Sequence, residues 1–272
     1  MSQTVAFVTG ATGHQGGATA RELVNAGVKV HALVRDPSSK SAVELQRLGV
    51  QLFPGDFDNL SSLKNAVEGT TAIFLNVTHA KNIIDTAIAS GTVTSIVYSS
   101  VTMAGNHEGF PNWGPDYPLG WYWQNKAQIE SMVRASGVKY WTPTASWMFP
   151  ELIQRRVFLT AYKPGTAMTV VDSDDVGKFA AAAITEPLAF NTHEIDFGVE
   201  SLTPAEIVQE LGRVAGEDIG LQFYSEESAK NLAEKDPRLY SQLWANEKYP
   251  IRLTKFADYL ENHRDQVLQT FK

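Results

Sequence analysis

The sequence contains no cysteine among its 272 residues. This absence excludes a disulfide framework, a thiolate nucleophile, a thiolate-bound iron–sulfur cluster and a cysteine zinc site. The sequence also lacks any apolar run near the roughly 20 residues that a membrane-spanning helix needs. Its first residues, Met1–Thr4, show neither the basic nor the apolar region of a secretory signal peptide. We therefore expect a cytoplasmic protein that does not bind a membrane.

Positive charge is scarce as well. The chain has 23 Lys and Arg against 30 Asp and Glu, a formal net charge of −7, and no long basic block. A nucleic-acid partner needs cations clustered on one face, so none is expected. A metal is not expected either. Asp172, Asp174 and Asp175 begin like a calcium loop, but Val176 and Ala183 stand where such a loop needs oxygen ligands.

What the chain does have is a regular alternation of short apolar runs and amphipathic segments over its first 150 residues. Unbroken apolar runs suit parallel strands that are covered by helices on both faces. The predicted fold class is therefore α/β, a Rossmann-type doubly wound parallel sheet with a smaller C-terminal lobe. The expected strands are 4–8, 28–34, 50–53, 72–77, 95–99 and 140–145, and the expected helices between them are 16–26, 39–48, 60–67, 80–89 and 121–136.

A glycine-rich turn joins the first expected strand to the first helix. Gly10 permits a tight turn, Gly13 lets the backbone approach a pyrophosphate, and Gly16 brings helix against strand. The start of the helix then offers unpaired N–H groups and a positive dipole end to phosphates. This strand–turn–helix context indicates a dinucleotide-binding site. The residues expected to contact the cofactor here are Gly10, Thr12, Gly13, His14, Gln15 and Gly16.

The end of the second strand indicates which dinucleotide is bound. NAD-binding proteins carry an acidic residue there for the ribose hydroxyls, but this sequence has Val34 followed by Arg35. Arg35 can clamp a 2′-phosphate by charge-assisted hydrogen bonds, which favours NADP(H). The alternative is that Arg35 is a solvated loop residue and that Asp36 does the acidic residue's work.

Two further strand ends carry candidate cofactor contacts. Asp56 follows the third strand, where an adenine would lie, and can accept from its exocyclic amine while Phe57 supplies apolar surface. The alternative is a plain turn in which Asp56 makes a local Asx hydrogen bond. Asn76, at the end of the fourth strand, is also predicted to contact the cofactor.

Together these motifs resemble the NmrA-like family of atypical short-chain dehydrogenases/reductases. That resemblance implies a Rossmann sheet with a small C-terminal substrate lobe. It also implies one of two functions, either an NADPH-dependent reductase (quinone and isoflavone reductases among them) or a non-catalytic redox sensor that binds a regulatory protein. The segments that carry the resemblance are 8–16, 32–37, 55–56, 96–100, 126–130 and 174–178.

The regular alternation stops after Pro150, which predicts two domains. We expect residues 1–150 to form the NADP(H)-binding Rossmann domain. Residues 151–272 mainly form the substrate-binding lobe, with the segment at about 166–186 returning to the Rossmann domain. Within the lobe, Thr203 and Glu206 have the spacing of a capping box that opens a helix.

The expected helix 121–136 carries a candidate catalytic pair. Tyr122 and Lys126 are four residues apart, which places both side chains on one face. A nearby ammonium would lower the pKa of the phenol and make Tyr122 a usable proton donor or acceptor. Lys126 would also hold the nicotinamide ribose. The alternative for Tyr122 is an aromatic lining residue, because tryptophans flank it on both sides.

The usual serine of such a catalytic set is missing. Val101 stands in the position that resembles it, and Thr102 would substitute if the strand end bulges. Ser100 is a second candidate for this role. The departure weakens the case for ordinary carbonyl reduction, but it suits reduction of an iminium or enone and a redox-neutral use of the cofactor.

Aromatic residues crowd two segments that follow the expected strands. Aromatic walls suit a flat, polycyclic or indole-like ligand, through stacking and through cation–π contact with a protonated amine. The alternatives are core packing between lobes and anchors for a protein partner. The residues predicted to bind substrate are Trp113, Trp121, Trp123, Trp147 and Phe149.

The sequence therefore supports three alternative functions. The first is an NADPH-dependent oxidoreductase acting on an aromatic, polycyclic or alkaloid-like small molecule, with Tyr122 moving a proton and Lys126 holding the ribose. The second is a redox-neutral isomerase or cyclase with bound NADP(H). The third is a non-catalytic NADP(H) sensor that binds a regulatory protein. The Tyr-x-x-x-Lys spacing favours an enzyme.

Overall fold

The computed structural model divides into two compact units. The first unit comprises Met1–Gly105, Trp121–Ser146 and Ser173–Asp196, and the second comprises Asn106–Gly120, Trp147–Asp172 and Phe197–Lys272. The described residues are 4–78, 80–110, 113–115, 117, 120–145, 153–154, 157–160, 164–165, 167–196, 198–223 and 254–270.

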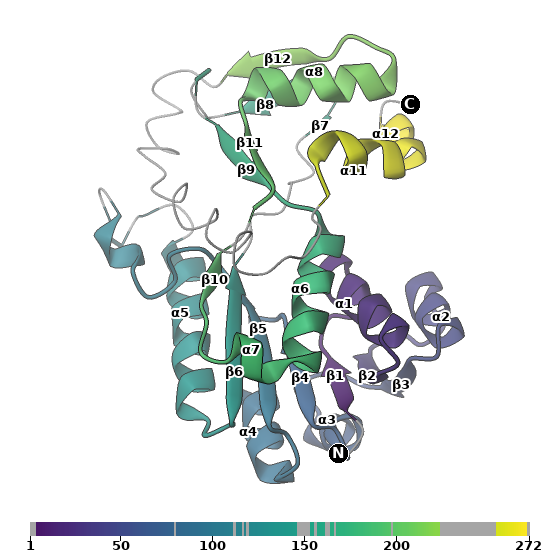
Figure 1. Ribbon diagram of the computed structural model, residues 1–272, viewed down its shortest axis with the longest axis vertical. Coiled ribbons are helices and arrows are strands. Elements are labelled where there is room, and N and C mark those ends of the chain that lie inside the picture. Colours follow the sequence, from purple (N-terminus) through teal and green to yellow (C-terminus); the bar gives the residue numbers. More distant parts are fainter. Residues whose placement is uncertain are drawn as a thin grey trace. The chain divides into compact units, whose positions relative to one another are not determined.

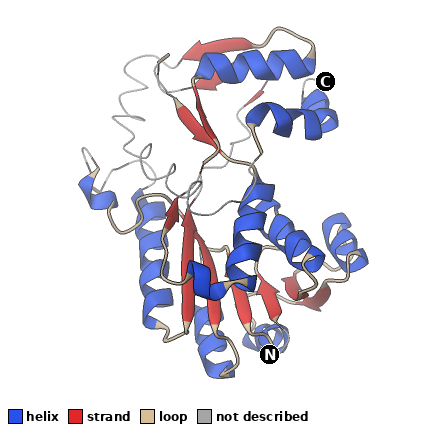
Figure 2. Cartoon of the chain, in the orientation of Figure 1, coloured by secondary structure: helices blue, strands red, loops and turns tan. Residues whose placement is uncertain are grey.

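A seven-stranded sheet in the order β10-β6-β5-β4-β1-β2-β3 forms the centre of the first unit. Every pairing within it is parallel. After β3 the chain crosses back over the sheet and adds β4 on the other side of β1, and helices cover both faces (Figure 2). The prediction of a Rossmann-type doubly wound parallel sheet is confirmed. The strands are β1 (Val5–Val8), β2 (Lys29–Val34), β3 (Gln51–Pro54), β4 (Ala72–Leu75), β5 (Ser95–Ser100), β6 (Tyr140–Ala145) and β10 (Ile195–Asp196).

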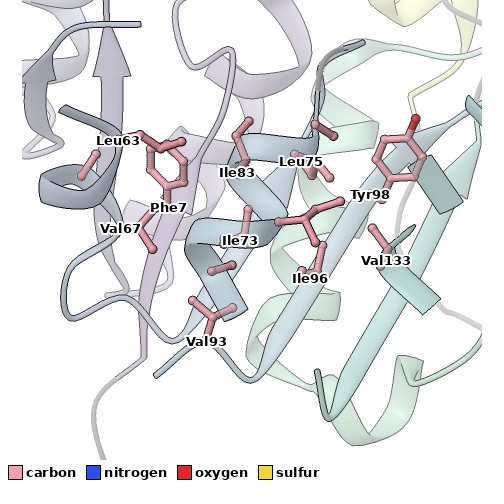
Figure 3. Packing of buried hydrophobic residues seen from close by; sticks show 14 of the residues in the cluster. Phe7, Leu63, Val67, Ile73, Leu75, Ile83, Val93, Ile96, Tyr98 and Val133 are labelled. Atoms are coloured by element: carbon pink, nitrogen blue, oxygen red, sulfur yellow. The ribbon is translucent and has the colours of Figure 1, made fainter. Parts of the chain in front are cut away.

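Three helices, α3 (Leu60–Val67), α4 (Lys81–Ser90) and α5 (Gly120–Ala135), pack on one face of this sheet. Alternate residues of the strands point into this layer, because successive side chains of a strand face opposite sides. The layer is the main apolar core, and Figure 3 shows its packing. Its labelled members are Phe7, Leu63, Val67, Ile73, Leu75, Ile83, Val93, Ile96, Tyr98 and Val133.

On the other face α1 (His14–Asn25) and α6 (Ser173–Thr185) lie side by side (Figure 1). Gly177 makes this close approach feasible. A Cβ at that position would lie 2.6 Å from the carbonyl carbon of Ala18. At the exposed edge of the pair, Arg21 and Asp174 form an ion pair of 2.6 Å. The first unit also contains α2 (Lys40–Arg47) beside β3 and α7 (Pro187–Phe190) beside β6.

The second unit has its own sheets and core. Strands β9 (Met168–Val170) and β11 (Glu200–Leu202) pair antiparallel. The remaining elements are β7 (Ile153–Gln154), β8 (Val157–Thr160), β12 (Gly220–Phe223), α8 (Pro204–Ala215), α11 (Phe256–Asn262), α12 (Arg264–Thr270) and the 3-10 turn η1 (His107–Gly109). Its apolar cluster includes Phe158, Ile207, Leu211, Val214 and Phe256.

The capping box predicted at Thr203 is present at the start of α8. The Thr203 hydroxyl accepts from the Glu206 N–H, and the Glu206 carboxylate accepts from the Thr203 N–H at 2.8 Å. None of the helices in the described ranges combines the length and the apolar character that crossing a bilayer requires.

Candidate functional site

The glycine turn between β1 and α1 folds back tightly on itself. Gly10 has φ +62°, a value that favours glycine, and its carbonyl accepts from the Gly13 N–H at 2.9 Å. A Cβ at Gly16 would lie 2.3 Å from the Gly10 carbonyl oxygen and 2.6 Å from that of Thr9. Only glycine fits at position 16 without displacing the turn.

The first turn of α1 is suited to an anion. Gly13 is the N-cap and has no side chain to cap the helix, and no acidic residue lies in the first turn. The free N–H groups and the helix dipole therefore meet no competing negative charge there. Thr9 ties the turn to β4, since its hydroxyl donates to the Phe74 carbonyl at 3.1 Å and accepts from the Asn76 N–H at 2.7 Å. Asn76 is thereby held beside the turn.

The end of β2 has an exposed cation and a carboxylate engaged locally. Arg35 is exposed, and no described residue forms an ion pair with it. Asp36 accepts from both the N–H and the hydroxyl of Ser38, at 2.8 and 2.6 Å. These bonds lower the pKa of the Asp36 carboxyl. Both contacts of Asp36 use one carboxylate oxygen, so the roles of Arg35 and Asp36 toward a ribose stay predictions.

The loop after β3 contains the Asx turn that was the alternative for Asp56. One oxygen of the Asp56 carboxylate accepts from the N–H groups of Asp58 and Asn59, at 3.0 and 2.9 Å. Phe57 packs against the main core, and its carbonyl accepts from the Asn82 amide at 3.1 Å. The local turn accounts for one Asp56 oxygen, and the adenine contact of Asp56 and Phe57 stays a prediction.

A buried chain of hydrogen bonds links the glycine turn to α5. The Ser99 hydroxyl donates to the Gln15 side-chain oxygen at 2.7 Å, and the Lys126 ammonium donates to the Ser99 carbonyl at 2.7 Å. All three residues are at least nine-tenths buried. Gln15 and Lys126, both predicted as cofactor contacts, are thus connected through one residue at the end of β5. No sequence pattern predicted this role for Ser99, which is marked only by its place at a strand end.

Two aromatic rings enclose the Lys126 ammonium. Its Nζ lies 5.0 Å from the centre of the Tyr98 ring and 5.5 Å from the centre of the Tyr122 ring. Burial lowers the pKa of Lys126 to about 8, while the charge of Glu130 opposes part of this shift. The structure therefore brings Tyr122 and Lys126 together, with the ammonium against the ring.

One expectation for this pair is wrong in its direction. The pKa of Tyr122 is raised above its usual range, and burial is the cause. Burial disfavours the charged phenolate. In this state Tyr122 is a weaker acid than free tyrosine and carries its proton at neutral pH.

The positions considered for the missing serine are buried and largely engaged. The Ser100 hydroxyl donates to the Glu130 carboxylate in a very short hydrogen bond. Val101 is 5% exposed, and Thr102 is 3% exposed with its carbonyl accepting from the Trp123 indole N–H at 3.1 Å. Neither Ser100 nor Thr102 presents an open hydroxyl, and the role of Thr102 in catalysis stays a prediction.

A family model for the NmrA-like family matches residues 1–268. The chain belongs to the NmrA-like family. A family member from Dictyostelium discoideum is 24% identical over 252 residues, 82% of this chain and 81% of that protein. An NmrA-like family domain-containing oxidoreductase of Penicillium ochrochloron is 36% identical over 120 residues, 37% of this chain and 36% of that protein. The match to this fungal oxidoreductase therefore spans little more than a third of its length.

Solved structures of NmrA-like proteins share the fold. The negative transcriptional regulator NmrA in complex with NAD has a TM-score of 0.72 at 19% identity, covering 100% of this chain and 96% of its own. Its complex with NADP has a TM-score of 0.71 at 19% identity, covering 100% and 93%. AtPrR2, solved with NADP⁺ and (+)pinoresinol, has a TM-score of 0.68 at 17% identity and covers both chains fully.

In this NmrA-like chain the predicted substrate-binding tryptophans have different surroundings. Trp121 is 62% exposed at the start of α5, whereas Trp123 is 7% exposed and is held by Thr102. Trp113 lies in the second unit, where its ring makes edge-to-face contacts with His107 and Phe110 and a tilted contact with Tyr117. Burial makes Trp123 part of the packing in this state. Trp147 and Phe149 lie outside the described residues.

Metal ligands are not gathered anywhere in the part of the chain that the structure describes. No three His, Asp or Glu side chains there come close enough to hold an ion. At the carboxyl end of β5, Ser99 and Ser100 are instead hydrogen-bonded to Gln15 and Glu130. The candidate site of this NmrA-like protein is thus a buried polar network beside a helix N-terminus that has no side-chain cap.

Proposed function

We propose that this protein is an NADP(H)-dependent oxidoreductase acting on an aromatic, polycyclic or alkaloid-like small molecule. The observation that carries the proposal is the chain Gln15–Ser99–Lys126, which connects the phosphate-binding turn to the lysine expected to hold the nicotinamide ribose. The names of the fungal oxidoreductase and of the AtPrR2 complex support the reaction class and the kind of ligand.

The residues present fit the dinucleotide. At Gly16 the backbone of the turn fills the space that a Cβ would need, and the start of α1 carries no competing acid. The α1 N-terminus would hold the pyrophosphate and Arg35 the 2′-phosphate, with Asn76, Asp56 and Phe57 as further predicted contacts. A bound NADPH supplies the hydride for reduction.

The protein's own side chains would donate a proton to the substrate and stabilise the group that has lost it. Tyr122 is protonated at neutral pH, because burial raises the pKa of the phenol, so it would be available as a proton donor to a reduced substrate rather than as a base. Lys126 lies against the Tyr122 ring and would favour the phenolate that this transfer leaves behind. Trp121, largely exposed next to Tyr122, would be open to a flat substrate.

A redox-neutral isomerase or cyclase is the second candidate, and one observation favours it. Ser100 is engaged by Glu130 and Val101 has no hydroxyl, so the site lacks the extra donor that carbonyl reduction usually employs. A non-catalytic NADP(H) sensor is the third candidate, and the description of NmrA as a negative transcriptional regulator favours it.

One experiment separates the three candidates. The protein is incubated with NADPH and a panel of aromatic enones, iminium compounds and quinones, and both cofactor absorbance and product mass are followed. An oxidoreductase consumes NADPH and yields a product heavier by two hydrogen atoms from an enone or quinone, and by one hydride from an iminium ion. A product of unchanged mass with no cofactor consumed favours the isomerase or cyclase. Absence of any product across the panel contradicts both enzymatic proposals.

A further inference from the structure

Glu130 is a buried carboxylate that the proposed reaction does not use. It lies on α5, one helical turn beyond Lys126, and is 8% exposed. Both carboxylate oxygens are engaged, one by the Ser100 hydroxyl and the other by the Arg134 guanidinium at 3.0 Å. Arg134 also pairs with Glu194 at 2.5 Å. Glu130 is therefore fixed in place by partners on β5 and on its own helix.

The fixed carboxylate lies close to a cation that burial disfavours. Residues four apart on a helix lie on one face, so Glu130 and Lys126 are neighbours. Burial of an ammonium without a counter-charge favours loss of its proton, and the pKa of Lys126 reflects both that burial and the opposing attraction of Glu130. The other titratable groups around Lys126 are Tyr98 on β5, Tyr122 and Arg134 on α5, and Glu194 beyond Arg134.

We infer that Glu130 is a positioning residue that keeps Lys126 charged and directed at the Ser99 carbonyl. Ser100 and Arg134 hold the carboxylate on the face of α5 that also carries Lys126, while the Ser99 carbonyl accepts from the ammonium. The role of Lys126 toward a cofactor rests on the proposed function. The stabilisation of its protonated form by the charge of Glu130 does not, and it can be measured without any cofactor.

The test is an NMR titration of Lys126 in protein labelled with ¹³C-lysine. The Lys126 Cε resonance is identified by its disappearance in Lys126→Arg, and its midpoint is expected near pH 8 in the unsubstituted protein. In Glu130→Gln, which keeps the shape and an acceptor oxygen, the midpoint is expected at lower pH by about one unit. Glu194→Gln is the matched control, because it breaks the Arg134–Glu194 pair and leaves Glu130 in place.

The midpoint of the Lys126 titration in the variants either supports the inference or overturns it. An unchanged midpoint in Glu130→Gln, or an equal shift in Glu194→Gln, overturns the inference and leaves Glu130 with a structural role only. If Glu130→Gln does not fold, Glu130→Asp decides, since a carboxylate withdrawn by one methylene must also lower the midpoint. NADPH affinity measured across the same pH range then tests the proposed function separately. A shifted titration with no cofactor binding contradicts only that function.

Discussion

The Lys126 ammonium donates to the Ser99 carbonyl at 2.7 Å, and the hydroxyl of the same serine donates to Gln15 at 2.7 Å. One residue at the carboxyl end of β5 therefore links the glycine turn to α5. In a Rossmann sheet, ligands bind outside the carboxyl ends of the strands. The linkage gives a physical reason why the start of α1 and the lysine of α5 would act on one bound molecule.

Gly16→Ala tests the fit of the glycine turn. The added methyl would lie 2.3 Å from the Gly10 carbonyl oxygen, so the turn must open. We expect NADPH affinity to fall by about 10-fold or more and stability to fall by about 1–3 kcal/mol. Calorimetric titration and urea unfolding measure these changes. Gly17→Ala should lose much less, because its added methyl would lie 3.1 Å from the Ala11 carbonyl oxygen, a tight contact but a far longer one, and it also gains helix propensity. Equal losses in the two variants would refute the steric argument.

Tyr122→Phe tests the proton donor. Loss of the phenol should lower turnover by about 10²- to 10⁴-fold, which is the usual contribution of general acid catalysis. NADPH binding should stay close to that of the unsubstituted protein, because the ring against Lys126 is retained. Tyr140→Phe is the control and should change neither quantity. Tyr140 is the first residue of β6, at the end of the sheet opposite the carboxyl ends of the strands. Unchanged turnover in Tyr122→Phe would remove this residue from the mechanism.

The buried Lys126 predicts how stability depends on pH. Its pKa is about 8 in the folded protein against 10.5 when unperturbed, so between these values the unfolded chain binds more protons. The free energy of unfolding should therefore gain a rising contribution from pH 8 toward pH 10. Urea unfolding across this range, compared with Lys126→Met, isolates the contribution. The rise should be smaller in the variant, and identical slopes would contradict the burial of a charged lysine.

Gly177→Ala tests the close packing of α1 against α6. A methyl at this position would lie 2.6 Å from the Ala18 carbonyl carbon and 2.8 Å from its Cβ. Overpacking of this kind costs about 1–3 kcal/mol. Urea unfolding should show that loss in Gly177→Ala and almost none in Gly109→Ala, where an added methyl meets nothing within 4 Å. A stability loss shared by both variants would mean that the helix contact is not the cause.

Local patterns predicted the first unit well, because buried parallel strands and their helices differ sharply in apolar period. The helix 60–67 and the strand 140–145 were predicted with the bounds that the structure has. The two-residue strand β10 was missed, since so short a segment has no period and joins the sheet only through β6. The short strands β7, β8, β11 and β12 of the second unit were missed for the same reason.

The site was predictable only where a residue acts through the local backbone. Gly10 and Gly16 follow from the turn that they form. The contact between Ser99 and Gln15 joins residues 84 positions apart, and the engagement of Ser100 by Glu130 depends on how α5 lies on β5. The pKa of Tyr122 shifts opposite to the expectation because spacing reveals a neighbouring ammonium but not the depth of burial.

Calorimetric titration with NADPH, NADP⁺ and NADH tests the central claim most directly, with Arg35→Ala beside the unsubstituted protein. We predict binding of both phosphorylated forms, weak binding of NADH, and a loss of about 10- to 100-fold for NADPH in Arg35→Ala, the usual value of a charge-assisted hydrogen bond. Arg47→Ala, another exposed arginine nearby on α2, should bind as the unsubstituted protein does. Binding of neither phosphorylated form, or a preference for NADH that Arg35→Ala leaves unchanged, would contradict the account.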